Sequence, residues 1–320
     1  MDSVVHIQGN PDSPLTPLIL IHAISGLALP YFALGSLSPS VSPEDDDDDE
    51  GRPVYGISSP IFESPSAFRR HAKSLPSLAL EYVRILRRDI QARGPYLLGG
   101  WSMGGMIAIE MAAILVAQGE QVKHVVMIDS LNPELYPPFQ DAQEHRVLST
   151  LTYNAIAWRI DGSEDPPTAT SMAPSGDSST VTSSNNSREN SDYGSGSDSD
   201  DENLDGQTST AGFMQQIREH VNHGLRMLAA YPSLRRRPYL PETEVTLIKC
   251  TLLDNLSPLL RDGRRAFARK NKLDPRCGWR EEQFKSFMSV PFAATHDGCF
   301  DAGVSGKLTA ILRDVLRDTV

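Results

Sequence analysis

The chain has 320 residues, of which 39% are hydrophobic, and a formal net charge of −11. This length allows one large domain or two ordinary ones. The acidity is local, because residues 44–50 hold seven acids and no base, and residues 164–205 hold ten acids and one base. The rest of the chain is therefore positive by about five charges, and the acidic total is no signal for a nucleic-acid partner or a particular substrate.

Cysteine usage and hydropathy exclude several further classes of protein. Cys250, Cys277 and Cys299 form no Cys-x-x-Cys pair, so we expect no disulfide framework, no metal site and a cytoplasmic setting. The apolar run at 15–37 contains prolines and polar residues and lacks a basic flank. We therefore expect neither a signal peptide nor a membrane-spanning helix there.

Taken in chain order, the sequence predicts strands that alternate with helices. Short apolar runs between turn residues predict strands, and apolar residues at helical spacing predict helices. Residues 131–160 are expected to form several short helices. The expected strands are 18–21, 53–58, 96–98, 122–128, 244–250 and 284–294, and the other expected helices are 30–37, 66–93 with a break at Pro76, 106–118, 213–231, 257–272 and 304–316. This alternation favours a mostly parallel central sheet with helices on both faces.

Two stretches interrupt this pattern inside what we expect to be one domain, residues 1–320. Residues 131–239 lie between two predicted strands and are expected to form a helical lid inserted over the sheet. Within them, residues 161–212 are rich in Ser, Asp, Asn, Gly and Thr and almost lack aliphatic side chains, which predicts disorder. Residues 38–52 are expected to form an acidic surface loop.

The segment from Tyr96 to Gln118 carries the main chemical signal. An apolar run enters the turn Gly100-Trp101-Ser102-Met103-Gly104, and a helix of small residues leaves it. Strand, Gly-x-Ser-x-Gly turn and helix are the parts of a nucleophile elbow, which holds a serine hydroxyl clear of the sheet at a strained backbone angle. The segment therefore predicts an α/β-hydrolase fold with Ser102 as the nucleophile.

A serine nucleophile needs a base, and the base needs an orienting acid. In this fold they follow in the order Ser, acid, His, which selects His296, just after the last predicted strand, as the base. The pair His220 and His223 is interpreted as part of the lid-helix surface and not as a metal site. Asp129 and Asp254 each follow a predicted strand, and the residues alone make them nearly equal candidates for the orienting acid.

An acyl-transfer site also needs two backbone N–H groups to hold an oxyanion. The first is expected from Met103, which follows the nucleophile and starts a helix whose N-terminus favours negative charge. The second should come from the turn at 22–26, after the first predicted strand. Ile24 is the first choice there, and Ala23 is the alternative.

The order and spacing of these parts resemble the type I thioesterase domains of polyketide synthases and nonribosomal peptide synthetases, and their free-standing relatives. The segment Ile21-His22-Ala23-Ile24-Ser25-Gly26 is similar to that family's His-Pro-x-Gly-Gly turn, with Ala23 in place of the proline and Ser25 in place of the first glycine. In the family the acid follows the earlier strand, and this favours Asp129 over Asp254. Residues 213–231 look like the family's lid helix.

The resemblance implies a serine thioesterase of secondary metabolism. An acyl chain would pass from a phosphopantetheine thioester, on an acyl carrier protein or a peptidyl carrier domain, to Ser102, with His296 as base and Asp129 as its partner. Water or an internal nucleophile would then release the product by hydrolysis or cyclisation. A start at Met1 without a carrier domain predicts a free-standing enzyme that meets its carrier in trans. No cofactor, nucleic acid or membrane partner is implied.

Two other functions stay open at this point. A carboxylesterase or lipase would use the same three side chains on oxygen esters. A non-catalytic binding protein of the same fold is the second alternative, but such proteins usually lack one of the three, and all three are present here.

Overall fold

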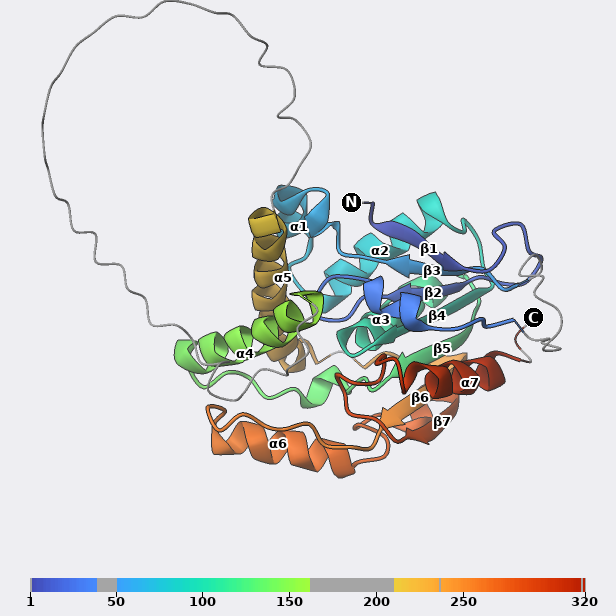
Figure 1. Cartoon of the computed structure of the whole chain (residues 1–320). Coiled ribbons are helices and arrows are strands. Elements are labelled where there is room, and N and C mark those ends of the chain that lie inside the picture. Colours follow the sequence, from blue (N-terminus) through green and yellow to red (C-terminus); the bar gives the residue numbers. More distant parts are fainter. Residues whose placement is uncertain (1, 39–50, 162–209, 236, 318, 320) are drawn as a thin grey trace, which may run out of the picture.

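The computed structural model describes residues 2–38, 51–161, 210–235, 237–317 and 319. Within these residues seven strands form one sheet in the order β1-β3-β2-β4-β5-β6-β7 (Figure 1). The strands are β1 (Val4–Gln8), β2 (Leu18–Ile21), β3 (Val54–Ile57), β4 (Tyr96–Trp101), β5 (Val122–Ile128), β6 (Leu240–Cys250) and β7 (Phe284–Phe292). β1 pairs antiparallel with β3, and every other neighbouring pair is parallel. The predicted mostly parallel sheet is confirmed.

Helices follow most strands, as the alternation predicted. The α-helices are α1 (Pro65–His71), α2 (Leu75–Asp89), α3 (Met103–Ala117), α4 (Ala142–Asp161), α5 (Thr210–Ala230), α6 (Asp262–Leu273) and α7 (Ser305–Leu316). Short 3-10 helices are η1 (Leu29–Ala33), η3 (Pro60–Phe62), η4 (Pro133–Leu135), η5 (Tyr231–Leu234) and η6 (Glu281–Gln283). None of the helices described here combines the length and the hydrophobicity needed to cross a bilayer.

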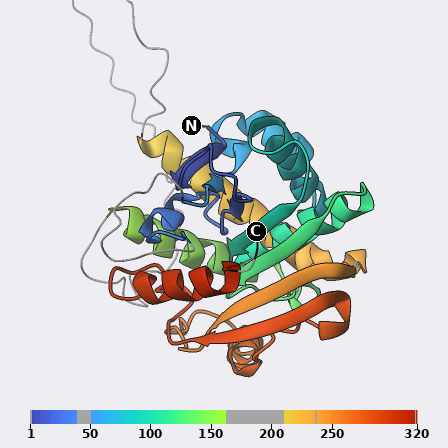
Figure 2. The ribbon, with the colours of Figure 1, turned by 90° about the vertical axis from the view of Figure 1, so that its right-hand side faces the viewer.

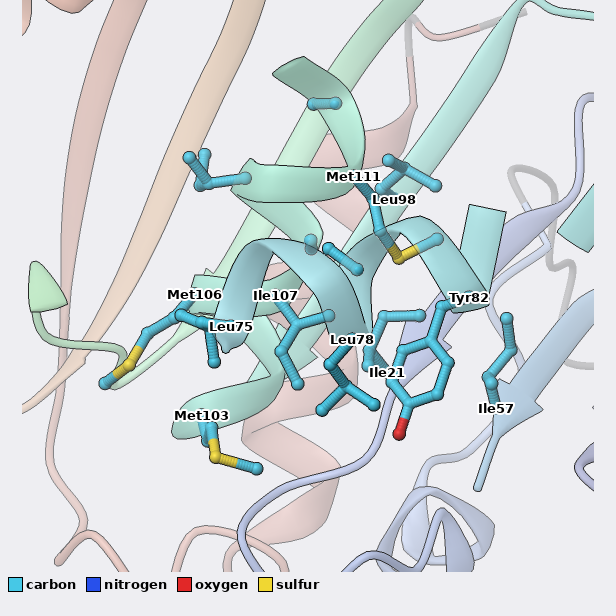
Figure 3. Packing of buried hydrophobic residues seen from close by; sticks show 14 of the residues in the cluster. Ile21, Ile57, Leu75, Leu78, Tyr82, Leu98, Met103, Met106, Ile107 and Met111 are labelled. Carbon is cyan, nitrogen blue, oxygen red and sulfur yellow. The ribbon is translucent and has the colours of Figure 1, made fainter. Parts of the chain in front are cut away.

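The sheet separates two hydrophobic cores. On one face α2 and α3 pack on the strands, and buried residues of α5 belong to the same core. Leu78 and Tyr82 of α2 and Met111 of α3 lie there beside the sheet residues Ile21 and Leu98 (Figure 3). On the other face α7 and η1 cover the strands (Figure 2). Fully burying one such aliphatic side chain stabilises the fold by about 1.5–3 kcal/mol, so both faces fix the sheet that carries the candidate site.

Several predicted boundaries were wrong in detail. Pro76 does not interrupt a helix: it lies in the first turn of α2, where a missing N–H costs little, and the chain breaks before it at Ser74, whose side chain caps α2. Residues 131–160 form η4 and the single 20-residue helix α4 instead of several short helices. The 30–37 segment forms only the 3-10 helix η1. β1 was not predicted, because Val4–Gln8 is a half-buried edge strand with no continuous apolar run.

The segment between β5 and β6 contains α4 and α5, which confirms a helical insertion at this place in the sheet. In Figure 1, α4 and α5 lie beside the left-hand ends of the strands, and α6 lies below α4. The predicted disordered tract at 161–212 and the predicted acidic loop at 38–52 fall almost entirely outside the described residues. Their conformations, and the one-domain prediction, stay predictions.

Candidate active site

The turn between β4 and α3 has the geometry of a nucleophile elbow. Ser102 has φ 57° and ψ −121°, a strained backbone conformation for a residue other than glycine. A Cβ on Gly100 would lie 2.4 Å from the carbonyl carbon of Gly104, and a Cβ on Gly104 would lie 2.1 Å from the carbonyl oxygen of Ile21. Strand and helix can therefore pass this closely only because both positions are glycine.

The structure brings the three predicted side chains together from three separate elements. Nε2 of His296 lies 3.0 Å from Oγ of Ser102, and Nδ1 of His296 lies 2.8 Å from Oδ2 of Asp129. Asp254, the alternative acid, accepts a hydrogen bond from the backbone N–H of His296 at 3.1 Å. Asp129 thus contacts the imidazole ring, whereas Asp254 holds the loop that carries it.

Asp129 is 8% exposed and is surrounded by cationic groups. Its Oδ1 accepts hydrogen bonds from Nζ of Lys249 at 3.1 Å and from the backbone N–H of Cys250 at 3.2 Å, and Nζ of Lys272 lies 3.6 Å from Oδ2. Burial alone would raise the pKa of Asp129, but the hydrogen bond and charge of His296 and the two ammonium groups outweigh it and lower the pKa. Asp129 is therefore ionised.

The ionised Asp129 controls the charge of the neighbouring ring. Desolvation lowers the pKa of His296, but the hydrogen bond that its ring donates to Asp129 and the negative charge of Asp129 outweigh this effect and raise the pKa to about 9. The indole of Trp101 covers the ring at 5.4 Å between centroids. The surroundings of His296 thus favour the protonated, imidazolium form of its ring.

The turn after β2 contains one predicted donor, the backbone N–H of Ile24. The carbonyl oxygen of Ala23 faces Nδ1 of His22 at 2.5 Å and accepts the N–H of Gly26 at 3.1 Å. Because C=O and N–H of a trans peptide point in opposite directions, the N–H of Ile24 points away from those partners. Ala23 and Ile24 both line the pocket above Ser102. Met103, the other predicted donor, is the first residue of α3, where helix N–H groups have no partner within the helix.

A pocket of about 450 Å³ opens over Ser102. Its accessible lining is mostly apolar, and Ser102, His296 and Asp129 are among the polar residues that line it. The walls come from α4 (Leu148, Leu151 and Ile156), from α5 (Leu225 and Leu228), from α6 (Phe267) and from the segment after β6 (Leu253, Leu256 and Leu260). Such a pocket suits an extended, largely hydrophobic acyl group. Among the described residues, no cluster of three or more His, Cys, Asp or Glu side chains could hold a metal ion.

Sequence reasoning missed or misplaced three residues near this site. Lys249 and Lys272 were not singled out, although a lysine within the apolar run of β6 was the available signal for a buried charge. His220 was predicted on the surface of the lid helix, and this is wrong, because its side chain is fully buried. Its side chain contacts Ile24, His22 and Phe68, which come from another part of the chain, so the helix pattern alone could not predict its burial.

The elbow, the Ser–His–Asp contacts and the mostly parallel sheet define an α/β-hydrolase fold. Solved structures show the same fold. The NocB thioesterase domain, in covalent complex with a fluorophosphonate nocardicin G analog, matches 98% of this chain and 99% of its own with a TM-score of 0.56 at 21% identity. RedJ, a thioesterase from the prodiginine biosynthetic pathway in Streptomyces coelicolor, matches 96% of this chain and 92% of its own with a TM-score of 0.53 at 18% identity.

Sequence comparison gives the family. Residues 52–155 match the family model of the thioesterase domain. Thioesterase pytI of Aspergillus terreus is 69% identical over 318 residues, and thioesterase pynI of Aspergillus niger is 36% identical over 325 residues, each alignment covering 99% of both chains. A non-reducing polyketide synthase of Pseudevernia furfuracea is 38% identical over 132 residues, 41% of this chain and 6% of that protein. The chain belongs to the thioesterase family, and it is a hydrolase.

Proposed function

We propose that this thioesterase takes polyketide or peptide acyl groups from a carrier-bound thioester through an acyl-Ser102 intermediate. The main observation behind the proposal is that His296 bridges Ser102 and Asp129 at hydrogen-bond distance, and that all three line a mostly apolar pocket. The match to part of a non-reducing polyketide synthase supports the substrate class. The reaction is acyl transfer, and it belongs to secondary metabolism.

In the first half-reaction the proton of Ser102 Oγ moves to Nε2 of His296, and Oγ attacks the thioester carbonyl carbon. The N–H groups of Met103 and Ile24 hold the negative oxygen of the tetrahedral intermediate. Asp129 keeps Nδ1 of the imidazolium hydrogen-bonded. The C–S bond then breaks, His296 returns the proton to the departing phosphopantetheine sulfur, and the acyl group stays on Ser102.

In the second half-reaction an acceptor loses a proton to His296 and attacks the carbonyl carbon of the acyl-Ser102 ester. The bond between this carbon and Oγ of Ser102 then breaks, and His296 returns the proton to Oγ, which restores the free serine. Water gives hydrolysis, and a nucleophile within the acyl chain gives cyclisation. We propose that residues 131–239 act as the lid that limits access of water, because α4 and α5 form much of the pocket wall. The carrier, an acyl carrier protein or a peptidyl carrier domain, would be met in trans. Three free, buried cysteines support a reducing, cytoplasmic setting.

Intact-protein mass spectrometry tests the proposal directly. After incubation with acyl carriers, wild type should gain the mass of the acyl group, whereas Ser102→Ala should gain none. Ser286→Ala, which changes an exposed serine on β7, is the matched control and should be acylated like wild type. Acylation that persists in Ser102→Ala would contradict the proposal.

The preference for sulfur over oxygen esters is tested with small substrates. Octanoyl-N-acetylcysteamine and the matched oxygen ester share one acyl chain and differ only in the leaving atom. We expect the larger kcat/KM for the thioester. A strong preference for the oxygen ester would indicate a carboxylesterase instead.

A further inference from the structure

The buried histidine of α5, His220, contacts the turn at residues 22–26, which we call the oxyanion turn because it contains the proposed donor Ile24. His220 is fully buried, and its Nδ1 lies 3.0 Å from the carbonyl oxygen of Ile24, 196 positions away in the sequence. Because a carbonyl oxygen can only accept, Nδ1 carries the proton and donates. Burial lowers the pKa of His220 to about 4, which is consistent with a neutral ring. One hydrogen bond thus joins the inserted helix to a turn that follows β2.

One helical turn further along α5, the helix backbone itself lies against both residues that we assign to the oxyanion hole. A Cβ on Gly224 would come within 3.3 Å of Cγ1 of Ile24 and within 3.3 Å of Sδ of Met103. His220 and Gly224 lie on the same face of α5, since residues four apart are neighbours on a helix. The packing is close at both positions, and only a glycine at 224 leaves these two side chains in place.

A second buried histidine, His22, also contacts this turn. The ring of His22 packs edge-on against the ring of His220, with centroids 4.9 Å apart, and Nδ1 of His22 faces the carbonyl oxygen of Ala23. A Cβ on Gly26, which has φ +84°, would lie 3.1 Å from Cγ of His220. Two buried histidines therefore hold two successive carbonyl groups, those of Ala23 and Ile24. The N–H of Ile24 lies between these two fixed points.

We propose that His220 is a positioning residue for the oxyanion hole: by holding the Ile24 carbonyl it fixes the direction of the Ile24 N–H and makes that direction depend on the placement of α5. This inference rests on the proposed function, because it assumes that the Ile24 N–H stabilises an oxyanion. The residues that line the pocket in the described part of the chain do not include His220. It acts through the turn and does not touch the substrate.

The test is single-turnover acylation of Ser102 by octanoyl-N-acetylcysteamine, followed by mass spectrometry. Each rate is divided by the concentration of Ser102 sites that a fluorophosphonate labels when its reaction is complete. Unfolded protein is not labelled and therefore does not lower the rate. His220→Leu replaces the imidazole with an apolar side chain of similar size that has no hydrogen-bond donor. We expect the maximal acylation rate of this variant to fall roughly 10- to 100-fold with little change in KM. His220→Asn, whose amide N–H can take the place of Nδ1–H, should recover most of the loss.

His124 supplies the matched control. It is a buried histidine on β5, 5% exposed, and its Nε2 bonds Oγ1 of Thr246 at 2.9 Å, on a strand that does not reach the oxyanion turn. His124→Leu should leave the rate per labelled site unchanged. The inference is overturned if His220→Leu is acylated as fast as wild type, or if His220→Asn is acylated no faster than His220→Leu. It is also overturned if the acylation rate of His124→Leu falls as much as that of His220→Leu.

The proposed function and this inference fail in different ways. A wild-type chain that forms no acyl-Ser102 with any thioester contradicts both. A wild type that acylates readily, together with an equally active His220→Leu, contradicts the role of His220 alone.

Discussion

Asp129 and Asp254 both bind His296, but at different atoms and with different consequences. Asp129 meets ring Nδ1 at 2.8 Å and is itself held by Lys249 and Cys250. Asp254 accepts only the backbone N–H of His296 at 3.1 Å. Both acids follow strands, so the sequence alone did not decide which of them pairs with His296. The distance of each acid to the ring depends on how the loop after β7 passes over the carboxyl ends of the strands.

The two acids are separated by comparing Asp129→Asn with Asp254→Ala. Loss of the Asp129 charge removes the group that orients the ring and stabilises the imidazolium, so we expect kcat to fall by about 10⁴. Asp254→Ala removes one backbone contact of the loop, and we expect a fall of at most roughly tenfold. Steady-state thioester hydrolysis measures both. A larger loss in Asp254→Ala would reverse the assignment.

The raised pKa of His296 predicts the pH dependence of acylation. In the proposed mechanism His296 must be neutral to accept the Ser102 proton, and Asp129 raises the pKa of His296 to about 9. The rate should therefore rise about tenfold per pH unit below that value and level off above it. In Asp129→Asn the raising charge is gone, so the inflection should move down toward the ordinary value of about 6.5, at a much lower maximal rate.

This profile is measured as single-turnover acylation from about pH 6 to about pH 10, with Ser102→Ala subtracted to remove spontaneous thioester hydrolysis. A wild-type rate that is already level at neutral pH would contradict a raised pKa. An inflection that stays in place in Asp129→Asn would show that another group sets it.

At the scale of elements, the elbow was predictable because its requirements are local. Gly100 is needed where β4 meets α3, Gly104 is needed where α3 meets β2, and Ser102 is needed between them, so one short motif determines strand, turn and helix. The continuous apolar runs of β2 and β5 were equally clear, because strands of a parallel sheet are buried on both faces. Both strands have the predicted bounds.

Elements that depend on distant partners were not predictable in the same way. α4 has no single apolar stripe in its sequence, since it borders the pocket, α5 and solvent on different sides, and several short helices were predicted in its place. The burial of His220 depends on a turn almost 200 positions away. Local pattern carries no information about either contact.

The close crossing of β2 and α3 is tested by Gly104→Ala, with Gly306→Ala as its control. A Cβ at position 104 would meet the backbone oxygen of Ile21 at 2.1 Å, so a strand or a helix must move. We expect a loss of at least about 2 kcal/mol in the free energy of unfolding. At Gly306, in the first turn of α7, nothing lies within 4 Å of a Cβ, and alanine should be neutral or stabilise by up to about 1 kcal/mol. Urea unfolding measures both, and equal stability of the two variants would contradict the packing argument.

At the scale of the whole molecule, a buried ion pair joins the inserted segment to α6. Nε of Arg264, on α6, lies 3.0 Å from Oε1 of Glu144, on α4, and both side chains are less than a tenth exposed. The same guanidinium donates to the carbonyl groups of Pro137 and Pro138 and lies over the rings of Tyr136 and Phe139. No sequence pattern predicted this pair, because its partners are 120 residues apart and each looks like an ordinary surface charge.

Because α4 and α6 both form pocket walls, this ion pair should connect stability with substrate binding. Arg264→Met leaves the Glu144 carboxylate buried without its partner, and we expect a loss of about 3–5 kcal/mol in unfolding free energy, together with a higher KM for octanoyl-N-acetylcysteamine and little change in kcat. Glu144→Leu should cost less, since Arg264 keeps its two carbonyl acceptors. The double variant removes both charges, so its loss should be smaller than the sum of the single losses. Urea unfolding and steady-state kinetics of the four chains measure this coupling, and strictly additive losses would show that the pair does not join the two helices.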